Sequence, residues 1–257
     1  MNLLLLEPGE IEAGGCVRLT GRRARHLLQV LHVEPGRAVR AGVIGGETGL
    51  CEVTEVRAEG VSVRFQPRPR PEAGDPLRLR LILALPRPKV LRRVLRAVAS
   101  LGVTELSLVN AWRVEKSYFG SPLLAPAALR QELLLGCEQG GHTRLPEVRV
   151  EPLLVPFLEA LSPEVKELRL LADPGALEGA ERLVARVAAA TRLVVAVGPE
   201  GGWIDRERES LLGRGFTPLS LGPCTLATEV AVAVLVGQLQ LLGRLAAEGI
   251  SSPAFTE

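Results

Sequence analysis

The sequence lacks the cysteine and histidine spacings that metal centres and redox motifs require. Its cysteines are Cys16, Cys51, Cys137 and Cys224. No two of them are close enough for a C-x-x-C pair or a zinc knuckle, and the three histidines are scattered, so we expect no bound metal. Unpaired cysteines are typical of a reducing compartment, which predicts a cytoplasmic protein.

A recognisable leader and a long apolar span are also missing. Residues 1–6 are apolar, but no basic segment precedes them, and an acidic residue and a proline follow at once. The most apolar stretch, residues 230–243, is shorter than the roughly 20 residues of a bilayer span and includes Gln238 and Gln240. We therefore expect no association with a membrane.

Acidic residues are absent between positions 77 and 104. The cations of this stretch are Arg78, Arg80, Arg87, Lys89, Arg92, Arg93 and Arg96. Arginine predominates over lysine throughout the chain, and its planar guanidinium group suits phosphate oxygens. We expect an anionic partner here although the formal net charge is only +2; a G+C-rich coding bias would explain the arginines equally well.

The first third of the chain is rich in short valine and leucine runs that glycines separate. Strands are expected at residues 17–20, 38–44, 50–56 and 61–66, with a helix at 22–31. This pattern favours a small β-barrel. Alternating prolines in residues 67–76 predict a stiff linker, so we expect one domain over residues 1–70 and a second over 76–250.

Strands and helices alternate in the rest of the chain. Strands are expected at residues 77–85, 103–109, 148–150, 168–172, 192–197 and 217–221. Helices are expected at residues 89–101, 127–138, 155–161, 177–190, 206–212 and 229–247. Because parallel strands need crossover connections, this order predicts an α/β domain whose mostly parallel sheet is covered on both faces.

A glycine-rich segment, Gly-Pro-Glu-Gly-Gly at residues 198–202, follows the apolar strand at 192–197. Ligands of open α/β sheets bind where the strands end, and glycines let backbone groups approach a ligand closely. The segment lacks the G-K-[ST] of a phosphate-binding P-loop and the G-x-G-x-x-G of a dinucleotide site. A tight connection without a ligand would have the same composition.

Two further segments stand out. Residues 219–229 lead from a short strand through Gly222-Pro223 to Thr228, which we expect to cap the long helix that follows. That helix is apolar nearly all round, which predicts burial in the domain or against a second subunit. Residues 136–146 contain Cys-Glu-Gln and end a helix with polar groups.

Together, in this order and behind a β-rich region, these segments resemble the SPOUT-class methyltransferases, specifically the family that methylates N3 of a uridine in 16S ribosomal RNA. The resemblance covers nearly the whole chain. Residues 137–139 match C-E-Q and residues 198–202 match G-P-E-G-G. Residues 26–32 are similar to H-x-x-x-V-L-R, 100–103 to E-L-G-V, and 221–231 to L-G-x-R-x-L-R-x-E-T-A.

The resemblance implies a PUA-like β-barrel domain followed by a domain with a deep trefoil knot, a homodimer, and S-adenosylmethionine held in the knot loops mainly by backbone groups. By matched position, the implied cofactor-binding residues are Leu171, Ala172, Gly198, Pro199, Glu200, Gly201, Gly202, Leu219, Leu221, Gly222, Leu226 and Thr228. The implied partner is ribosomal RNA or the small ribosomal subunit.

Methyl transfer to a uracil nitrogen requires that both reactants be positioned and that the N3 proton be accepted. The carboxylates nearest the implied cofactor loops are Glu200 and Glu229, which are the candidates for the base. The candidates for RNA contacts are Arg22, Arg23, Arg25, His26, Arg92, Arg93 and Arg96. Each of these arginines could equally belong to a solvated basic face.

The last motif departs from the family pattern. Cys224 and Ala227 stand where arginines are usual, and Val230 replaces a threonine. His32 replaces an arginine and Ser100 a glutamate. Three hypotheses therefore stay open: a 16S ribosomal RNA uridine-N3 methyltransferase, a methyltransferase of the same fold with another RNA target, and a catalytically silent RNA-binding protein.

Overall fold

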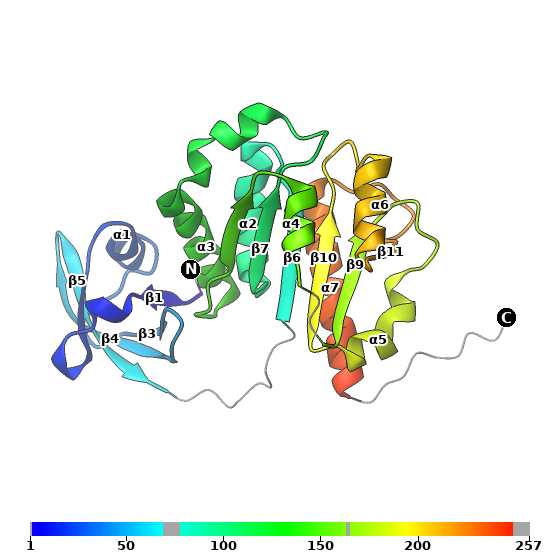
Figure 1. Cartoon of the computed structure of the whole chain (residues 1–257). Helices are drawn as coiled ribbons and strands as arrows, with labels where there is room; N and C mark the ends of the chain where they lie inside the picture. The colour runs from blue at the N-terminus through cyan, green and yellow to red at the C-terminus, as the bar shows by residue number, and fades with distance from the viewer. Residues whose placement is uncertain (1, 69–77, 163–164, 249–257) are drawn as a thin grey trace.

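The chain forms two β-sheets, each with its own covering helices, in a computed structural model that describes residues 2–68, 78–162 and 165–248 (Figure 1). The small sheet has the strand order β1-β3-β4-β5-β2. Its elements are β1 (Leu4–Leu6), β2 (Cys16–Leu19), α1 (Gly21–Gln29), β3 (Ala38–Val43), β4 (Thr48–Arg57) and β5 (Gly60–Pro67). The strands and the helix that we predicted in this region are confirmed, with small shifts of their ends.

Strand β1 was not predicted, and it joins the two parts of the molecule. It pairs in parallel with β3. Because side chains alternate along a strand, Leu4 and Leu6 pack in the core of the small sheet, whereas Leu3 and Leu5 belong to the core of the large sheet. The apolar start of the chain is therefore explained by burial in two cores.

The large sheet is parallel throughout its described strands, in the order β11-β9-β10-β6-β7-β8. Its strands are β6 (Arg78–Ala84), β7 (Glu105–Val109), β8 (Glu147–Glu151), β9 (Glu167–Ala172), β10 (Arg192–Val197) and β11 (Thr217–Leu219). This confirms the predicted α/β fold with a parallel sheet. Every residue of the central strand β10 is buried, as a strand covered on both faces requires.

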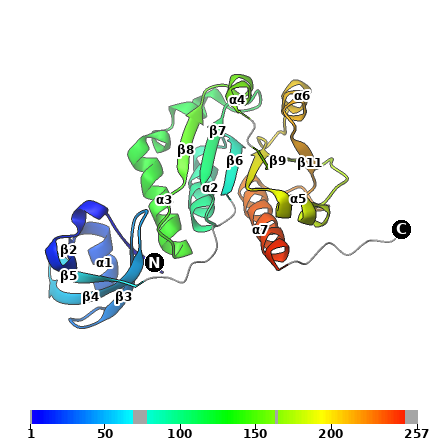
Figure 2. The same cartoon turned by 60° about the horizontal axis from the view of Figure 1, so that its bottom comes forward.

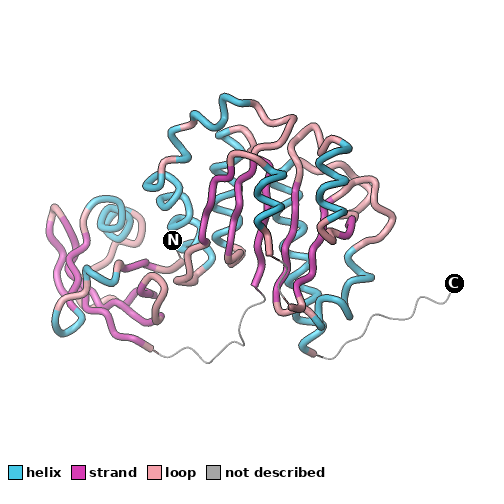
Figure 3. Tube along the Cα trace, viewed as in Figure 1, coloured by secondary structure: helices cyan, strands magenta, loops and turns pink. Residues whose placement is uncertain are grey.

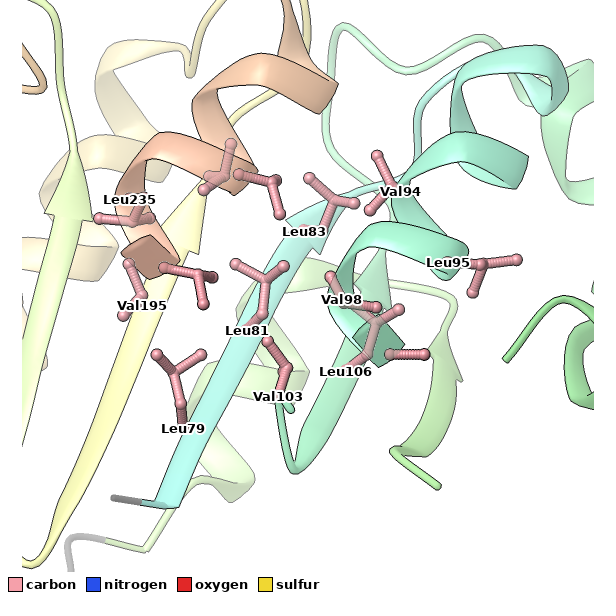
Figure 4. Close-up of a cluster of buried hydrophobic side chains, with 14 of the residues drawn as sticks. Leu79, Leu81, Leu83, Val94, Leu95, Val98, Val103, Leu106, Val195 and Leu235 are labelled. Atoms are coloured by element: carbon pink, nitrogen blue, oxygen red, sulfur yellow. The ribbon is translucent and has the colours of Figure 1, made fainter. Parts of the chain in front are cut away.

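Helices cover both faces of the large sheet (Figure 2). One layer holds α2 (Pro88–Ser100), α3 (Pro126–Gly140), α5 (Val184–Ala189) and α7 (Thr228–Ala247), and the other holds α4 (Leu154–Ala160) and α6 (Asp205–Gly213). The first layer meets the odd-numbered residues of β6 and β10, including Leu81 and Val195 (Figure 4). The second layer meets Val194 and Ala196, so the alternation of β10 supplies both cores.

Three sequence-based expectations need correction or fall outside the structure. The helix expected at residues 177–190 begins later, as a short 3₁₀ helix at Ala180–Leu183 followed by α5, because residues 173–179 follow the sheet edge. Thr228 is the first residue of α7 and not its cap; Ala227 takes the cap position without a side-chain hydrogen bond. The proline-rich linker lies largely in residues 69–77, outside the described residues.

Helix α7 is longer than the apolar stretch that we considered from the sequence. It has 20 residues, and its mean hydropathy of 1.7 makes it long and apolar enough to cross a membrane by these two criteria. It contacts α2, α5 and β10. These contacts make it part of the helical layer on the large sheet.

The two sheets are held together where α1 meets the end of α3. The guanidinium group of Arg22 donates two hydrogen bonds to the Glu138 carboxylate, at 2.6 and 2.8 Å, and that side chain is only 4% exposed. The backbone N–H groups of Asn2 and Leu3 donate to the Glu138 carbonyl. Glu138 therefore uses both its side chain and its backbone to bind the small sheet unit.

A row of charged side chains crosses the amino-terminal end of the large sheet. Arg80 and Arg192 both donate to the carboxylate of Glu105. Glu167 accepts a hydrogen bond of 2.7 Å from Arg169, and its carboxylate lies 3.8 Å from Arg192. The Glu167 and Arg169 side chains are 3% and 9% exposed, so this ion pair is buried. Removal of either partner would leave a buried charge without compensation and would destabilise the fold.

We expect the substitution Glu167→Ala to lower the free energy of unfolding by about 3–5 kcal/mol, because it leaves the buried Arg169 cation without its carboxylate. Urea denaturation measures this loss. The control is Glu147→Ala, since the Glu147–Arg149 pair is more than half exposed on both sides and should contribute much less to stability. Equal effects of the two substitutions would contradict the role of the buried row.

Candidate functional site

Three loops meet at the carboxyl end of the large sheet, because β9, β10 and β11 are parallel neighbours there (Figure 3). They are residues 173–179 after β9, 198–204 after β10 and 220–227 after β11. These loops are far apart in the sequence. The parallel arrangement of their strands brings them together at the carboxyl end of the sheet.

Backbone hydrogen bonds tie these loops together. The N–H of Asp173 donates to the carbonyl of Leu219 at 3.0 Å, and the N–H of Ser220 donates to the carbonyl of Glu178 at 2.8 Å. Gly179 and Ser220 form a parallel bridge. The loops after β9 and β11 thus extend the sheet beyond its regular strands and hold one wall of a pocket.

The pocket between the loops has a volume of about 250 Å³. Its lining includes the predicted cofactor residues Ala172, Gly198, Pro199, Glu200, Gly202, Leu221, Gly222, Leu226 and Thr228. Three predicted residues are placed elsewhere: Leu171 and Leu219 are buried in the two cores, and Gly201 is turned toward Arg113. The loops predicted from the sequence therefore come together, although not every residue in them faces the pocket.

Gly198 has the closest packing of the glycines in this pocket. A Cβ atom added to it would lie 3.0 Å from Nε1 of Trp203 and 3.2 Å from two ring carbons of the same side chain. Nε1 of Trp203 is buried and has no hydrogen-bond partner among the described residues. At Gly198, therefore, the packing of Trp203 leaves no room for a side chain. Nε1 of Trp203 is a buried hydrogen-bond donor that a ligand could satisfy.

Charged groups of both signs stand at the pocket. Nε of Arg208 donates to the Asp173 carboxylate at 3.0 Å. The Glu200 carboxylate lies 3.6 Å from Nε of Arg87, and both side chains are 60% exposed. Of the two candidates for the catalytic base, Glu200 lines the pocket, and Glu229 is not among the described residues that line it.

Glu229 is engaged by its surroundings. Its own backbone N–H at the start of α7 and the guanidinium of Arg93, 3.0 Å away, hold the pKa of this carboxyl below its usual range. A carboxylate stabilised in this way is a weaker base than a free one.

Most of the residues predicted to contact RNA are paired with carboxylates. Arg22 binds Glu138, Arg23 binds Glu10, Arg92 and Arg96 share Glu132, and Arg93 binds Glu229. Arg25 is exposed and has no carboxylate partner in the described parts of the chain; its Nε bonds to the carbonyl of Gly21. Acidic residues contributed by other segments thus neutralise much of the basic face that the sequence predicts.

A second hollow, of about 450 Å³, lies where α1 faces α2 and α3. Arg22, His26 and Arg96 line it, so three predicted RNA residues from distant segments share one surface. Burial lowers the pKa of His26, and its Nε2 has no hydrogen-bond partner among the described residues. Within the described ranges, no three His, Cys, Asp or Glu side chains could hold a metal ion.

Several residues that line the first pocket were missed from the sequence. Trp203 directly follows the glycine-rich segment, and Cys224 and Thr225 stand inside the second motif, so their neighbourhood could have indicated them. Asp173 and Arg208 carry no such local signal, because only the fold brings the end of β9 to the first turn of α6.

A parallel α/β sheet with a pocket built from loops at its carboxyl end defines a ligand-binding α/β domain. The family model described as an RNA methyltransferase domain matches residues 73–240, so the chain belongs to this family. A relative from Treponema pallidum (strain Nichols), ribosomal RNA small subunit methyltransferase E, is 31% identical over 90% of this chain and 87% of its own length.

Solved structures agree with this fold. A protein from Legionella pneumophila, solved with its bound cofactor S-adenosylmethionine, is 25% identical and superposes with a TM-score of 0.76 over 93% of this chain and 97% of its own. The ribosomal RNA small subunit methyltransferase E of Neisseria gonorrhoeae has a TM-score of 0.77, covering 94% and 98% of the two chains, at 23% identity.

We expect Cys224 to react with a disulfide reagent such as dithionitrobenzoate in the folded protein, and Cys51 and Cys137 only after unfolding. Cys224 is exposed at the pocket, whereas burial raises the pKa of Cys51 and of Cys137 to about 12, so that few thiolates form near neutral pH. Mass spectrometry of labelled peptides identifies the sites, with Cys224→Ser as the control. Rapid labelling of Cys51 in folded protein would contradict the buried assignment.

Proposed function

We propose that this protein transfers a methyl group from S-adenosylmethionine to ribosomal RNA of the small subunit, at N3 of a uridine. Membership of the RNA methyltransferase family and the three-loop pocket at the sheet edge support the proposal. The single observation that carries it is the convergence of the Gly198–Gly202 loop with the loops after β9 and β11 around one pocket. The Treponema relative, a small-subunit ribosomal RNA methyltransferase, supports the substrate.

The residues at the pocket fit the cofactor. Glycine backbone at Gly198 and Gly202 can approach a ligand closely, and the buried Nε1 of Trp203 is an unsatisfied donor beside it. Asp173 and Arg208 provide one anionic and one cationic group for a ligand that carries both a carboxylate and positive charges. When bound, S-adenosylmethionine supplies an electrophilic methyl group on its sulfonium sulfur.

The chain's own contribution to the reaction is to position the uracil, to exclude water and to accept the N3 proton. Glu200 is the better candidate for the base, because it lines the pocket, whereas Glu229 is not part of the described lining. Glu229 acts instead as the partner of Arg93 at the start of α7.

The knot, the domain division and the localisation belong to the same proposal. Strand β11 lies at the sheet edge beyond β9, yet the helix that follows it, α7, packs against α2 and β10 near the middle of the sheet. A return path of this kind supports a trefoil knot of the SPOUT class. Residues 1–70 form the PUA-like domain, residues 76–250 form the methyltransferase domain, and the protein acts in the cytoplasm.

Purified protein with S-adenosylmethionine should methylate small ribosomal subunits or naked 16S RNA from cells that lack their own uridine-N3 methyltransferase. Methylation at N3 blocks base pairing, so reverse transcriptase should stop at the modified uridine, and nucleoside mass spectrometry identifies the product. Methylation of a different RNA would favour a methyltransferase of the same fold with another RNA target. RNA binding without methyl transfer would favour a catalytically silent RNA-binding protein.

The matched variants for this assay are Gly198→Val and Gly213→Ala. Gly198→Val forces side-chain atoms against Trp203 and should weaken cofactor binding in calorimetry at least about tenfold, or about 1.4 kcal/mol, and reduce transfer accordingly. An added Cβ at Gly213 meets no atom within 4 Å, so Gly213→Ala should retain both. Unchanged affinity in Gly198→Val would remove the pocket from the proposal.

We also propose a homodimer formed through α7. On one face of this helix, Val230 and Leu241 are 44% and 47% exposed, and Val234 lies between them at helical spacing. An added Cβ at Gly237 meets nothing within 4 Å, which leaves room for a second helix to approach. Between Val230 and Leu241 this face of α7 is therefore apolar and contains a small residue, and the exposed Arg244 follows it.

Leu241→Arg should convert the dimer to a monomer in sedimentation velocity, because a charge placed in an apolar contact loses its hydration. The control is Val165→Arg, at a residue that precedes β9 and is 86% exposed. Circular dichroism should show that both variants are folded. A wild-type protein that sediments as a monomer would exclude the α7 dimer.

A further inference from the structure

A large aromatic side chain is exposed in the segment after β7, which no motif covers. Trp112 follows β7 at the carboxyl end of the sheet and is 80% exposed. Its neighbours Ala111 and Val114 are each 6% exposed, and the N–H of Val114 donates to the carbonyl of Ala111 at 3.0 Å. Trp112 thus stands at the tip of a tight turn whose two flanks are anchored in the core.

The turn is also attached to the pocket. The backbone N–H of Trp112 donates to Oε1 of Glu207 at 2.8 Å, and the other oxygen of this buried carboxylate accepts from the N–H of Ile204 at 3.1 Å. Ile204 ends the loop that begins with the pocket glycines. The position of Trp112 is therefore tied by a single side chain to the loop after β10.

A second connection comes from the next residue. Nη1 of Arg113 donates to the carbonyl of Gly201, and a Cβ added to Gly201 would lie 3.1 Å from Cδ of Arg113. Arg113 therefore lies along the outside of the glycine-rich loop whose other side lines the pocket. Trp112 and Arg113 are therefore both attached to the loop after β10 that lines the pocket, Trp112 through Glu207 and Arg113 through Gly201.

Two arginines contact the glycine-rich loop to which this turn is attached. Arg87 stands beside Glu200, and Arg113 covers Gly201. Aromatic side chains combined with arginines are typical of surfaces that bind unpaired nucleic acid, since every base can stack on an indole and arginine binds the phosphates. A structural role does not explain Trp112, because the core contacts of the turn are made by Ala111 and Val114.

We propose that Trp112 is a stacking platform for an unpaired nucleobase of the RNA substrate at the rim of the cofactor pocket. This inference rests on the proposed function for the identity of the substrate. The stacked base fixes the position of the RNA strand relative to the pocket, so Trp112 contributes to substrate binding and leaves the bound cofactor unchanged.

The test uses the full chain with S-adenosylmethionine and naked 16S RNA. Trp112→Ala should raise the KM for RNA by about 5-fold to 150-fold, the range that loss of one stacked base produces. The kcat and the dissociation constant of the cofactor should stay at the wild-type values. Trp112→Phe retains an aromatic face and should keep the KM within about threefold of wild type. Val165→Ala, an exposed apolar residue before β9, is the matched control.

Fluorescence gives a readout that does not depend on turnover. The chain has two tryptophans, Trp112 and Trp203, so Trp112→Phe leaves only the one in the pocket. Addition of RNA should quench the wild-type emission, and this quench should be lost in Trp112→Phe although the variant still binds RNA.

The outcomes separate this inference from the proposed function. Methyl transfer by Trp112→Ala with an unchanged KM would overturn the stacking platform and leave the function intact. A quench by RNA in a wild-type protein that transfers no methyl group would support the platform and count against the function. A change of sedimentation in Trp112→Ala would assign the residue to a contact between protein copies and overturn the inference.

Discussion

The site depends on the parallel hydrogen bonding of β10 between β9 and β6. Neighbouring parallel strands have their carboxyl ends at the same end of the sheet. This constraint brings the loops after β9, β10 and β11 together. It also requires that both faces of β10 be buried, which accounts for the uninterrupted apolar run of this strand. At the amino-terminal end of the sheet, Glu105 of β7 pairs with Arg80 of β6 and Arg192 of β10, and the Glu167 carboxylate of β9 lies 3.8 Å from Arg192. Ion pairs therefore join the strands at this end, whereas loops form a pocket at the other.

Ion pairing changes how the basic surface should be understood. The arginines of α1 and α2 are arranged as an RNA-binding face would be, but Glu132, Glu138 and Glu229 each neutralise at least one of them. These pairs have defined structural roles, since Glu138 joins the two sheets and Glu229 stands at the start of α7. Near the pocket, Arg87 pairs with Glu200, whereas Arg113 donates to the carbonyl of Gly201 and directly follows the exposed Trp112. The proposed RNA contacts therefore shift toward the segment of Trp112 and Arg113.

The fold was largely predictable because its periodic signals are strong. Apolar runs bounded by glycine and proline predicted the regular strands of both sheets, and helical spacing predicted α2, α3 and α7. Two errors have physical causes. β1 is three residues long, and its side chains are buried alternately in two different cores, so it has no polar face by which to recognise it. The segment before α5 was predicted as helix, whereas it makes a turn closed by the N–H of Ala176 and the carbonyl of Asp173, and backbone bonds attach its end to the loop after β11.

The sequence by itself determined the fold class and the loops of the candidate site, because both are encoded in local patterns: strand periodicity, and glycines that lack a side chain where a ligand approaches. Only the tertiary structure decided which residues of those loops face the pocket, that Arg208 meets Asp173, and that the backbone of Trp112 meets Glu207. Such contacts join segments far apart in the chain and depend on strand register and packing, which no single stretch of sequence specifies.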